Sequence, residues 1–341
     1  MTSWLVTGGA GFIGSAFLRR LVRRAGDTVV CLDALTYAGN RDSVDALPGL
    51  RFVHGDIRDR ALVSELLRAH RTDVVVNLAA ESHVDRSIDG AMPFVDTNVA
   101  GTVALLEAAT AHGRPLRFHH VSTDEVFGDL GPDDPPFTDR SPYRPSSPYA
   151  ASKAAADHFV RAWGRTHGLA VVISNASNTY GPRQHPEKLI PVTILNALAG
   201  RPLPIYGRGT NVRDWLHVDD HAAALERVAL EGEPGGTYLV GGGAERTNVE
   251  VVETVCRALD RRRPANAPHA RLIEHVADRP GHDRRYAVDA ARLGNELGWT
   301  PAHDFETGME ATVDWYLDNE RWWAPVRDEA ARRRGVAAEG A

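Results

Sequence analysis

Short apolar runs alternate with longer amphipathic runs over the first half of the chain, and this alternation is its clearest structural signal. Apolar runs of strand length predict β-strands at residues 4–7, 28–32, 50–54, 73–78, 117–121 and 170–173. Apolar positions at helical spacing predict helices at residues 15–24, 59–69, 94–111 and 149–166. The run at 73–78 is almost continuously apolar, as expected for a parallel sheet that is covered on both faces. The alternation therefore predicts an α/β protein with a Rossmann-type, doubly wound parallel sheet.

The pattern changes near residue 180. Turn signals such as Gly181-Pro182 and Arg201-Pro202 multiply there, and basic residues appear among them. We expect a first domain at residues 1–180, to which the chain returns around 213–230, and a smaller C-terminal substrate-binding lobe formed mainly by residues 181–326. The charged, alanine-rich stretch 327–341 is expected to be a flexible tail.

Composition narrows the class of protein. The chain has 341 residues, of which 43% are hydrophobic and 25% are charged, and this is ordinary for a globular protein with room for two lobes. The formal net charge of -6 gives no basic footprint for nucleic acid. The two cysteines, Cys31 and Cys256, lie far apart and suggest neither a disulfide framework nor a metal motif. Because the N-terminus does not look like a leader and no apolar run is long enough to span a membrane, we expect a cytoplasmic protein. We expect no metal site.

A glycine-rich turn follows the first predicted strand. Gly8, Gly11 and Gly14 have a G-x-x-G-x-x-G spacing, a variant of the fingerprint that lets a backbone approach a pyrophosphate at a helix N-terminus. Taken alone, such glycines often only form a turn, and Asp33 could be a solvated residue at a strand end. Asp33 nevertheless closes the second strand about 20 residues later, where an acid accepts hydrogen bonds from ribose hydroxyls and repels a 2′-phosphate. The combination predicts a bound dinucleotide, NAD rather than NADP.

Candidate catalytic residues follow the predicted strand at 117–121. The stretch Ser-Thr-Asp-Glu at 122–125 lies at the carboxyl end of that strand, where open α/β sheets place their chemistry. Tyr149 and Lys153 open the next predicted helix and share one face of it. We expect the ammonium to lower the pKa of the phenol, so that Tyr149 can take a proton from a sugar hydroxyl. The two carboxyls could supply a further acid and base, although an exposed turn is the plainer alternative.

Motifs in both halves of the chain resemble a known family. The segments that resemble the extended short-chain dehydrogenase/reductase superfamily are residues 8–14, 79–86, 122–125 and Tyr149-x-x-x-Lys153. The segments that narrow the resemblance to the dTDP-glucose 4,6-dehydratases are residues 186–191, 213–215 and 278–282. The resemblance runs from about residue 4 to about residue 323. The Thr-Asp-Glu triplet is its discriminating part, because sugar-nucleotide 4-epimerases of the same fold lack the acid pair.

The resemblance implies an NAD-dependent hydro-lyase that converts dTDP-glucose to dTDP-4-keto-6-deoxyglucose. Tyr149 would take the C4 hydroxyl proton while hydride leaves C4 for NAD⁺, with Lys153 lowering the pKa of Tyr149 and Thr123 hydrogen-bonding O4. Glu125 would then remove the C5 proton, Asp124 would protonate the departing C6 hydroxyl, and hydride would return to C6. Asp124 must hold a proton at working pH while Glu125 does not, and two close carboxyls separate their pKa values in this way.

The resemblance also assigns binding residues. Beyond Gly8, Gly11, Gly14 and Asp33, the expected cofactor set is Phe12, Ile13, Asp56, Ile57, Ala79, Ala80, Ser82, Thr97, Tyr149 and Lys153. The expected substrate set is His83, Thr123, Asn178, Lys188, Leu189, Pro204, Tyr206, Arg213, Asn248, Arg279 and His282. Arg213 and Arg279 could grip a diphosphate as guanidinium forks, whereas Arg271 matches no motif and is expected to be a surface cation. Thr179 and Phe127 depart from the family, in which Asn and Tyr are more usual.

Assembly and three alternative functions complete the expectations. The helical runs at 94–111 and 149–166 resemble the pair that forms a four-helix bundle across a homodimer in this superfamily, although both could simply cover the sheet.

The alternative functions are a 4,6-dehydratase for UDP or CDP sugars, a 4-epimerase or decarboxylase of the same fold, and a non-enzymatic dinucleotide-binding regulator. An epimerase would leave the acid pair unused, and a decarboxylase would need a cation where Asp124 stands. A regulator would not need Tyr149 or Lys153, yet the chain has both.

Overall fold

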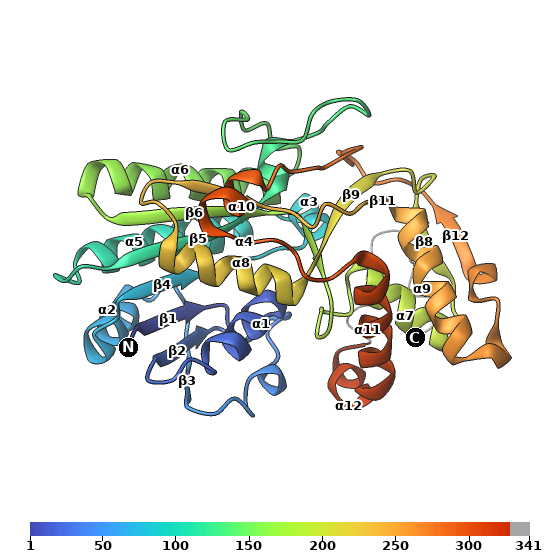
Figure 1. Cartoon of the computed structure of the whole chain (residues 1–341), viewed down its shortest axis with the longest axis horizontal. Coiled ribbons are helices and arrows are strands. Elements are labelled where there is room, and N and C mark those ends of the chain that lie inside the picture. Colours follow the sequence, from blue (N-terminus) through green and yellow to red (C-terminus); the bar gives the residue numbers. More distant parts are fainter. Residues whose placement is uncertain (328–341) are drawn as a thin grey trace.

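The computed structural model describes residues 1–327, and its larger part is built on a seven-stranded sheet (Figure 1). Across the sheet the strands are β10 (Thr237–Val240), β6 (Ala170–Ala176), β5 (Arg117–Thr123), β4 (Val74–Asn77), β1 (Ser3–Thr7), β2 (Thr28–Asp33) and β3 (Leu50–His54). All neighbouring strands are parallel. The strand order reverses between β1 and β4, and a doubly wound sheet places its ligand crevice at the carboxyl ends beside such a point. The predicted α/β fold with a Rossmann-type sheet is confirmed.

Helices cover both faces of this sheet. Those on one face are α1 (Phe12–Leu21) and α8 (Val218–Glu231), and those on the other are α2 (Arg60–His70), α5 (Thr102–Thr110) and α6 (Pro148–His167). Trp4 and Val6 of β1 pack with the first pair, whereas Leu5 points to the other face and packs with the second group. Burial on both faces explains why these strands are apolar at successive positions rather than at alternate ones.

The predicted helix at 94–111 is interrupted. The elements there are α4 (Met92–Phe94), a π-helical turn (Val95–Gly101) and α5. Asn98 in this turn accepts a hydrogen bond from Glu81 N (2.8 Å) and donates one to Ser152 Oγ (2.8 Å). Hydrophobic spacing does not reveal the extra residue of a π-turn, because it changes the helix phase only locally. The other predicted helices are present with shifted ends, and α1 begins at Phe12 rather than at residue 15.

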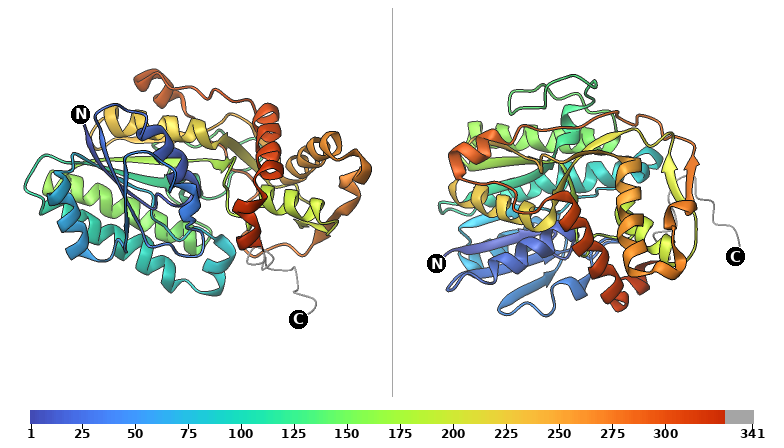
Figure 2. Two further views of the ribbon diagram at one scale, coloured as in Figure 1. Left: turned by 90° about the horizontal axis from the view of Figure 1, so that it is seen from below. Right: turned by 45° about the vertical axis from the view of Figure 1, so that its right-hand side comes forward.

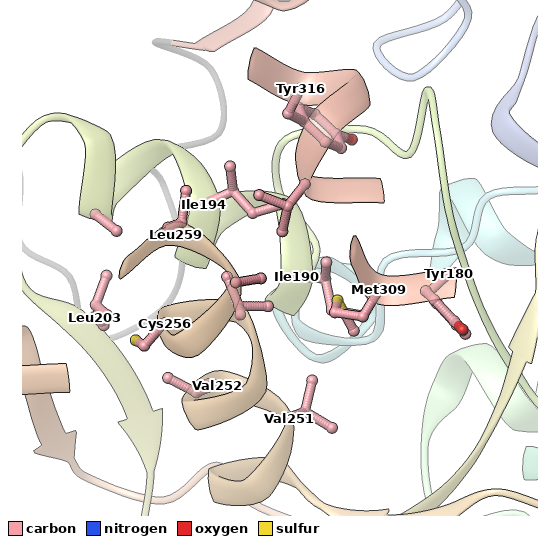
Figure 3. Packing of buried hydrophobic residues seen from close by; sticks show 14 of the residues in the cluster. Tyr180, Ile190, Ile194, Leu203, Val251, Val252, Cys256, Leu259, Met309 and Tyr316 are labelled. Carbon is pink, nitrogen blue, oxygen red and sulfur yellow. The ribbon is translucent and has the colours of Figure 1, made fainter. Parts of the chain in front are cut away.

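The rest of the chain forms a second lobe around two small sheets. One sheet holds β11 (Glu245–Thr247), β9 (Val212–His217) and β7 (Asn178–Tyr180), and the other holds β12 (Ile273–Val276) and β8 (Leu203–Tyr206). The helices of this lobe are α7 (Leu189–Leu198), α9 (Asn248–Arg262), α11 (Phe305–Asp318) and α12 (Glu320–Trp323). Their core is a separate hydrophobic cluster that includes Ile190, Val252, Leu259, Met309 and Tyr316 (Figure 3). In each view, α11 and α12 lie between the large sheet and the pair α7 and α9 (Figures 1 and 2).

Three segments bear on the predicted organisation. Around 213–230 the chain forms β9 in the small sheet and then α8 on the large one, and it continues into β10, which the sequence analysis did not predict. Two further short helices are α3 (Val84–Asp89) and α10 (Ala291–Leu297), and α10 packs with α8 and β10. The predicted flexible tail lies, apart from Arg327, outside the described residues. Within residues 1–327, no helix combines the length and the apolar character that a membrane crossing requires.

Candidate active site

A cavity of about 610 Å³ opens at the carboxyl ends of the strands and extends to the second lobe. All the residues predicted to be catalytic and all those predicted to bind the cofactor line it, together with Asn178 and Lys188 of the substrate set. The predicted substrate residues that do not border this cavity are His83, Leu189, Pro204, Tyr206, Arg213, Asn248, Arg279 and His282. The cavity is also lined by residues to which the sequence analysis assigned no role, among them Glu81, Glu187 and His221.

The glycine-rich turn packs against the end of β4 so closely that side chains are excluded. A Cβ on Gly8 (φ +68°) would lie 2.6 Å from the nitrogen of Ala79, and a Cβ on Gly14 would lie 2.2 Å from the oxygen of Gly8. Gly11 is the N-cap of α1 and provides no side-chain cap. The first N–H groups of this helix therefore lack a capping side chain, which suits the binding of a pyrophosphate.

Asp33 ends β2 beside this turn. Its Oδ2 accepts a hydrogen bond from Ala10 N (2.8 Å), and its Oδ1 accepts one from Leu35 N (2.8 Å). Each oxygen keeps a further lone pair for a ligand hydroxyl. Across the cavity, Asn178 Oδ1 is buried and has no partner among the described residues. A helix N-terminus for phosphates and a fixed carboxylate for ribose hydroxyls fit an NAD-type dinucleotide.

The acid pair lies where β5 gives way to a short 3-10 turn (Asp124–Phe127). Thr123 Oγ1 donates to Asp124 Oδ1 (3.3 Å) and accepts from Glu125 N (3.3 Å). The Asp124 side chain is buried, so the alternative of an exposed turn does not apply. Burial, with the neighbouring Glu125 charge, raises the pKa of Asp124 well above its usual range. Burial also raises the pKa of Glu125, but the guanidinium groups of Arg279 and Arg213 oppose this rise. The two carboxyls thus favour a protonated Asp124 beside a more acidic Glu125.

Tyr149 and Lys153 come from the first turns of α6, which Ser147 caps by accepting from Ala150 N. Lys153 Nζ donates to the carbonyl of Val121 in β5 (2.8 Å). The lysine is buried, and this lowers its pKa to about 8. Its ammonium therefore lies inside the protein, against the strand that ends in the acid pair.

One electrostatic expectation from the sequence is wrong. The pKa of Tyr149 is raised, not lowered, first because the phenol is buried and then because the Glu125 charge lies close by. A hydrogen bond from Thr123 acts in the opposite direction but does not outweigh these effects. Desolvation of the phenolate dominates here, and sequence spacing gives no measure of it.

The predicted substrate cations have protein partners. Arg213 Nη2 donates to the carbonyl of Asp283 (2.9 Å), and its guanidinium lies over the ring of Tyr286 (4.2 Å). Arg279 Nη1 lies 3.2 Å from Asp85 Oδ1. Both lower the pKa of Glu125, so they lie close enough to act on the acid pair although they do not border the cavity. In contrast, the exposed Arg271 donates to the carbonyl of Pro268 (2.8 Å), as expected for a surface cation.

Other predicted substrate residues gather near the same second-lobe segments. Tyr206 OH donates to Asp85 Oδ2 (3.0 Å), and its ring meets that of His282 edge-on (6.1 Å). Lys188 Nζ donates to the carbonyl of Ser82 (3.1 Å). The rest occupy defined places: His83 caps α3, Leu189 begins α7, Pro204 lies in β8 and Asn248 begins α9.

Two acids in this region were not predicted. Asp85 joins Arg279 to Tyr206, and Glu187 lies within 3.8 Å of nitrogen atoms of His83, Arg86 and Lys188. Asp85 lies in segment 79–86 and Glu187 in segment 186–191, and both segments carried the family resemblance. Their position in these segments was the one sequence feature that could have pointed to them. An acid placed among several cations is a stronger indication of a site than any one of these residues alone.

The two departures from the family occupy different surroundings. Phe127 is buried, stacks on Phe137 (5.1 Å) and does not border the cavity. Thr179 does border it, and its hydroxyl lies 2.9 Å from His221 Nδ1. A missing tyrosine hydroxyl at residue 127 is therefore a matter of packing, whereas residue 179 contacts the cavity itself.

In residues 1–327, one group of three potential metal ligands lies close together, formed by His217, Asp219 and His303. None of the three borders the cavity. His119 and His120 are buried in β5, and His119 Nε2 lies 2.9 Å from Ser174 Oγ.

Comparison with known proteins places the chain. A sequence model of the GDP-mannose 4,6 dehydratase family matches residues 5–312. The dTDP-glucose 4,6-dehydratase of Xanthomonas campestris is 54% identical, with 99% of each chain covered, and that of Neisseria meningitidis is 52% identical, with 97% of this chain and 98% of the relative covered.

Solved structures agree. The dTDP-glucose 4,6-dehydratase of Streptomyces venezuelae, crystallised with NAD, matches with a TM-score of 0.89 at 48% identity over 95% of this chain and 100% of that chain. A UDP-glucose 4-epimerase of Thermus thermophilus, also with NAD, has a TM-score of 0.85 at 32% identity over 93% of this chain and 100% of that chain. The epimerase therefore shares the fold, while the relatives near 50% identity carry the dehydratase name. The chain belongs to the dTDP-glucose 4,6-dehydratase family.

Proposed function

We propose that this chain is an NAD-dependent hydro-lyase that converts dTDP-glucose to dTDP-4-keto-6-deoxyglucose. The observation that supports this most directly is the acid pair beside Tyr149, with Asp124 buried and Glu125 partly buried, in the same cavity as the glycine-rich turn. Epimerisation at C4 needs only the tyrosine and the lysine. Elimination of water across C5 and C6 also needs an acid for the departing oxygen and a base for the neighbouring proton, and the pair supplies both.

The cofactor site is proposed along the carboxyl ends of β1, β2 and β4. Gly8, Gly11 and Gly14 would hold the pyrophosphate at the N-terminus of α1, and Asp33 would accept from the adenosine ribose. The other expected members line the same cavity: Phe12, Ile13, Asp56, Ile57, Ala79, Ala80, Ser82 and Thr97. When bound, NAD would supply the hydride acceptor for C4 and the hydride donor for C6, and its positive nicotinamide would favour the phenolate form of Tyr149.

Tyr149 is the proposed base for the C4 hydroxyl, and Lys153 is its electrostatic partner. The phenol is buried and lies close to carboxyls, which disfavours the phenolate that this role requires. A protonated Lys153 one helical turn away opposes that effect, and the Thr123 hydroxyl can hydrogen-bond either the phenol or the sugar O4. The role of Tyr149 therefore depends on Lys153 keeping its proton.

Asp124 and Glu125 are proposed as acid and base for the elimination. The raised pKa of Asp124 favours the protonated form that can give a proton to the C6 oxygen. Nearby cations hold Glu125 closer to the ionised form that can take the C5 proton. The same cations, Lys188, Arg213 and Arg279, are proposed to attract the diphosphate of the substrate. The other expected contacts, His83, Asn178, Leu189, Pro204, Tyr206, Asn248 and His282, belong to this proposal.

The organisation of the chain is part of the proposal. Residues 1–180, with the return around 213–230, are the proposed NAD-binding domain, and residues 181–326 mainly form the proposed lobe for the nucleotide sugar.

A homodimer is proposed through the helical segments at 92–110 and α6, where Met92, Val95 and Phe159 are exposed. A monomer by light scattering at micromolar concentration would reject the dimer. The proposed location is the cytoplasm, and cell fractionation would test it.

Isotope transfer tests the proposed reaction. The substrate is dTDP-glucose with deuterium at C4, converted in ordinary water and followed by mass and NMR analysis. Deuterium should appear at C6 and solvent hydrogen at C5, because hydride stays on a bound cofactor whereas the C5 proton passes through Glu125. Deuterium that returns to C4 of a galactose-configured product would indicate an epimerase, and an unchanged hexose would exclude both reactions. A parallel panel of dTDP-, UDP- and CDP-glucose tests the nucleotide.

A further inference from the structure

A buried carboxylate lies behind Tyr149 and Lys153, and no step of the proposed reaction uses it. Asp157 follows Lys153 by four residues, just as Lys153 follows Tyr149, so the three share one face of α6. The Asp157 side chain is 0% exposed. Burying a carboxylate is unfavourable unless it is paired or hydrogen-bonded, so its neighbours indicate what it does.

One oxygen of this carboxylate is held by three donors. Asp157 Oδ2 accepts from Ser122 Oγ (3.0 Å), Tyr143 OH (2.7 Å) and Asn175 Nδ2 (3.2 Å). Tyr143 OH accepts in turn from Arg161 Nη2 (2.8 Å). Hydrogen bonds to an anion favour its ionised form and fix its orientation. Burial raises the pKa of Asp157, and the Lys153 charge is the largest of the effects that oppose this.

The other oxygen faces Lys153 across a histidine. Asp157 Oδ1 lies 3.5 Å from His120 Nε2, which lies 3.4 Å from Lys153 Nζ. Asn77 Nδ2 lies 3.2 Å from His120 Nδ1 and can only donate there, so a neutral His120 carries its proton on Nε2. Burial, with the Lys153 charge, keeps the pKa of His120 well below its usual value, so the ring stays neutral. Lys153 and Asp157 are therefore the charged groups here; they make no direct ion pair, a neutral imidazole lies beside both, and Asp157 Oδ1 has no hydrogen-bond partner among the described residues.

We propose that Asp157 is a positioning residue that supplies the buried negative charge by which Lys153 stays protonated beside Tyr149. The inference rests on the proposed function, because it matters only where a lysine charge must support a phenolate. Burial lowers the pKa of Lys153 to about 8, and Asp157 is the group that opposes this fall. Without Asp157 the amine would lose its proton closer to neutral pH, and the phenolate would lose its partner. The Asp157 charge also raises the pKa of Tyr149 itself, so its removal should move the acid limb to lower pH as well, and the alkaline limb alone reports on Lys153.

The test compares pH profiles of kcat. Other ionisable groups near the pair are Tyr149 and Arg161 on α6, His119 and His120 on β5, Tyr143 in the preceding loop, and Asp124 and Glu125 at the end of β5. All of them remain in Asp157→Asn, which keeps the shape of the side chain and removes its charge. We expect the alkaline limb of the profile to move to lower pH by about one unit or more, with KM for the sugar nucleotide little changed.

The matched control is Tyr143→Phe. It removes one hydrogen bond to the same carboxylate oxygen and leaves the charge, so its alkaline limb should stay close to that of the wild-type enzyme. A limb that does not move in folded Asp157→Asn, or that moves as far in Tyr143→Phe, would overturn the inference. Asp157→Ser offers a second neutral variant if the asparagine does not fold, with thermal unfolding as the check for both. Product analysis of the wild-type enzyme is independent of this comparison, so a failed proposed function would be recognised separately.

Discussion

The large sheet and the second lobe contribute to the cavity in different ways. All the predicted residues contributed by the sheet, its helices and its strand-end loops line the cavity, apart from His83, because strand ends and helix starts converge at one edge of a parallel sheet. From the second lobe only Asn178 and Lys188 of the predicted residues do so, and Arg213 and Arg279 act on the acid pair from further back. In the sheet, position along a strand determines where a side chain lies. In the lobe, location depends on contacts between segments far apart in sequence.

The two regions also differ in charge. The sheet side holds the buried carboxyl of Asp124 and the partly buried carboxyl of Glu125, whereas the lobe side holds the cations that lower the pKa of Glu125. If this division is functional, changes on the sheet side should act mainly on kcat and changes on the lobe side mainly on KM.

The largest effect should come from Glu125→Gln on the sheet side. This change removes the proposed base but leaves Tyr149, Lys153 and the glycine-rich turn, so C4 oxidation should proceed and elimination should stop. We expect turnover to fall by about 10²- to 10⁴-fold, with reduced cofactor and a 4-keto sugar accumulating on the enzyme. Steady-state assays and the absorbance of the reduced cofactor measure both. Turnover at the wild-type rate would be incompatible with the assigned role.

Arg279→Met should have the next largest effect, on the lobe side. It removes a proposed diphosphate contact and leaves Asp85 without its ion pair, so kcat/KM should fall by about 10- to 100-fold, mainly through KM. The pKa of Glu125 should rise, because a cation that favours its ionised form is lost. The acid limb of the pH profile should therefore move to higher pH. Arg271→Met, at an exposed loop position, is the matched control and should change neither. Equal losses of kcat/KM in Arg279→Met and Arg271→Met would show that Arg279 has no specific role at the site.

Gly14→Ala should weaken cofactor retention on the sheet side. Its Cβ would lie 2.2 Å from the carbonyl oxygen of Gly8, so the turn must shift at a cost of about 1–3 kcal/mol. We expect less NAD per purified chain and a lower melting temperature. Gly90→Ala meets nothing within 4 Å and should behave like the wild-type protein. If Gly14→Ala purified with the wild-type amount of NAD, the close contact between Gly14 and the Gly8 carbonyl would not be needed for cofactor binding.

The smallest effect should be the change in stability of Asp124→Asn, a variant that should also lose turnover because it lacks the proposed acid. Because the folded pKa of Asp124 lies above its unfolded value, the folded state binds the extra proton between the two values, and stability falls as pH rises through that window. At pH above the folded pKa, the variant has no buried charge to desolvate and should melt at a higher temperature than the wild-type protein. The difference should shrink towards acidic pH. Melting temperatures measured across pH test this, and a difference between the two proteins that stays constant with pH would contradict a raised pKa for Asp124.

The sequence predicted the sheet well because its signals are local. An apolar run marks a strand such as β4, and a glycine spacing marks the turn before α1. The short strands β8 and β12 pair with each other across a long stretch of chain, and neither is distinctive alone. The pKa of Tyr149 was mispredicted for a related reason, because burial and the Glu125 charge arise only once separate segments meet. Asp85 and Glu187 lay in recognisable segments, but their ion pairs depend on the assembled fold.

The hydroxyl of Thr123 gives the proposed reaction a way to restore its starting protons. At the end of a turnover Tyr149 holds the proton taken from the C4 hydroxyl, while Asp124 has given its own to the departing water and Glu125 is unchanged. Thr123 forms a hydrogen bond with Tyr149 and donates one to Asp124 Oδ1 (3.3 Å). A hydroxyl that accepts from one neighbour and donates to the other can relay a proton between them. The enzyme could then begin each cycle recharged from within, with the hydrogen of one substrate's C4 hydroxyl leaving in the water released from the next.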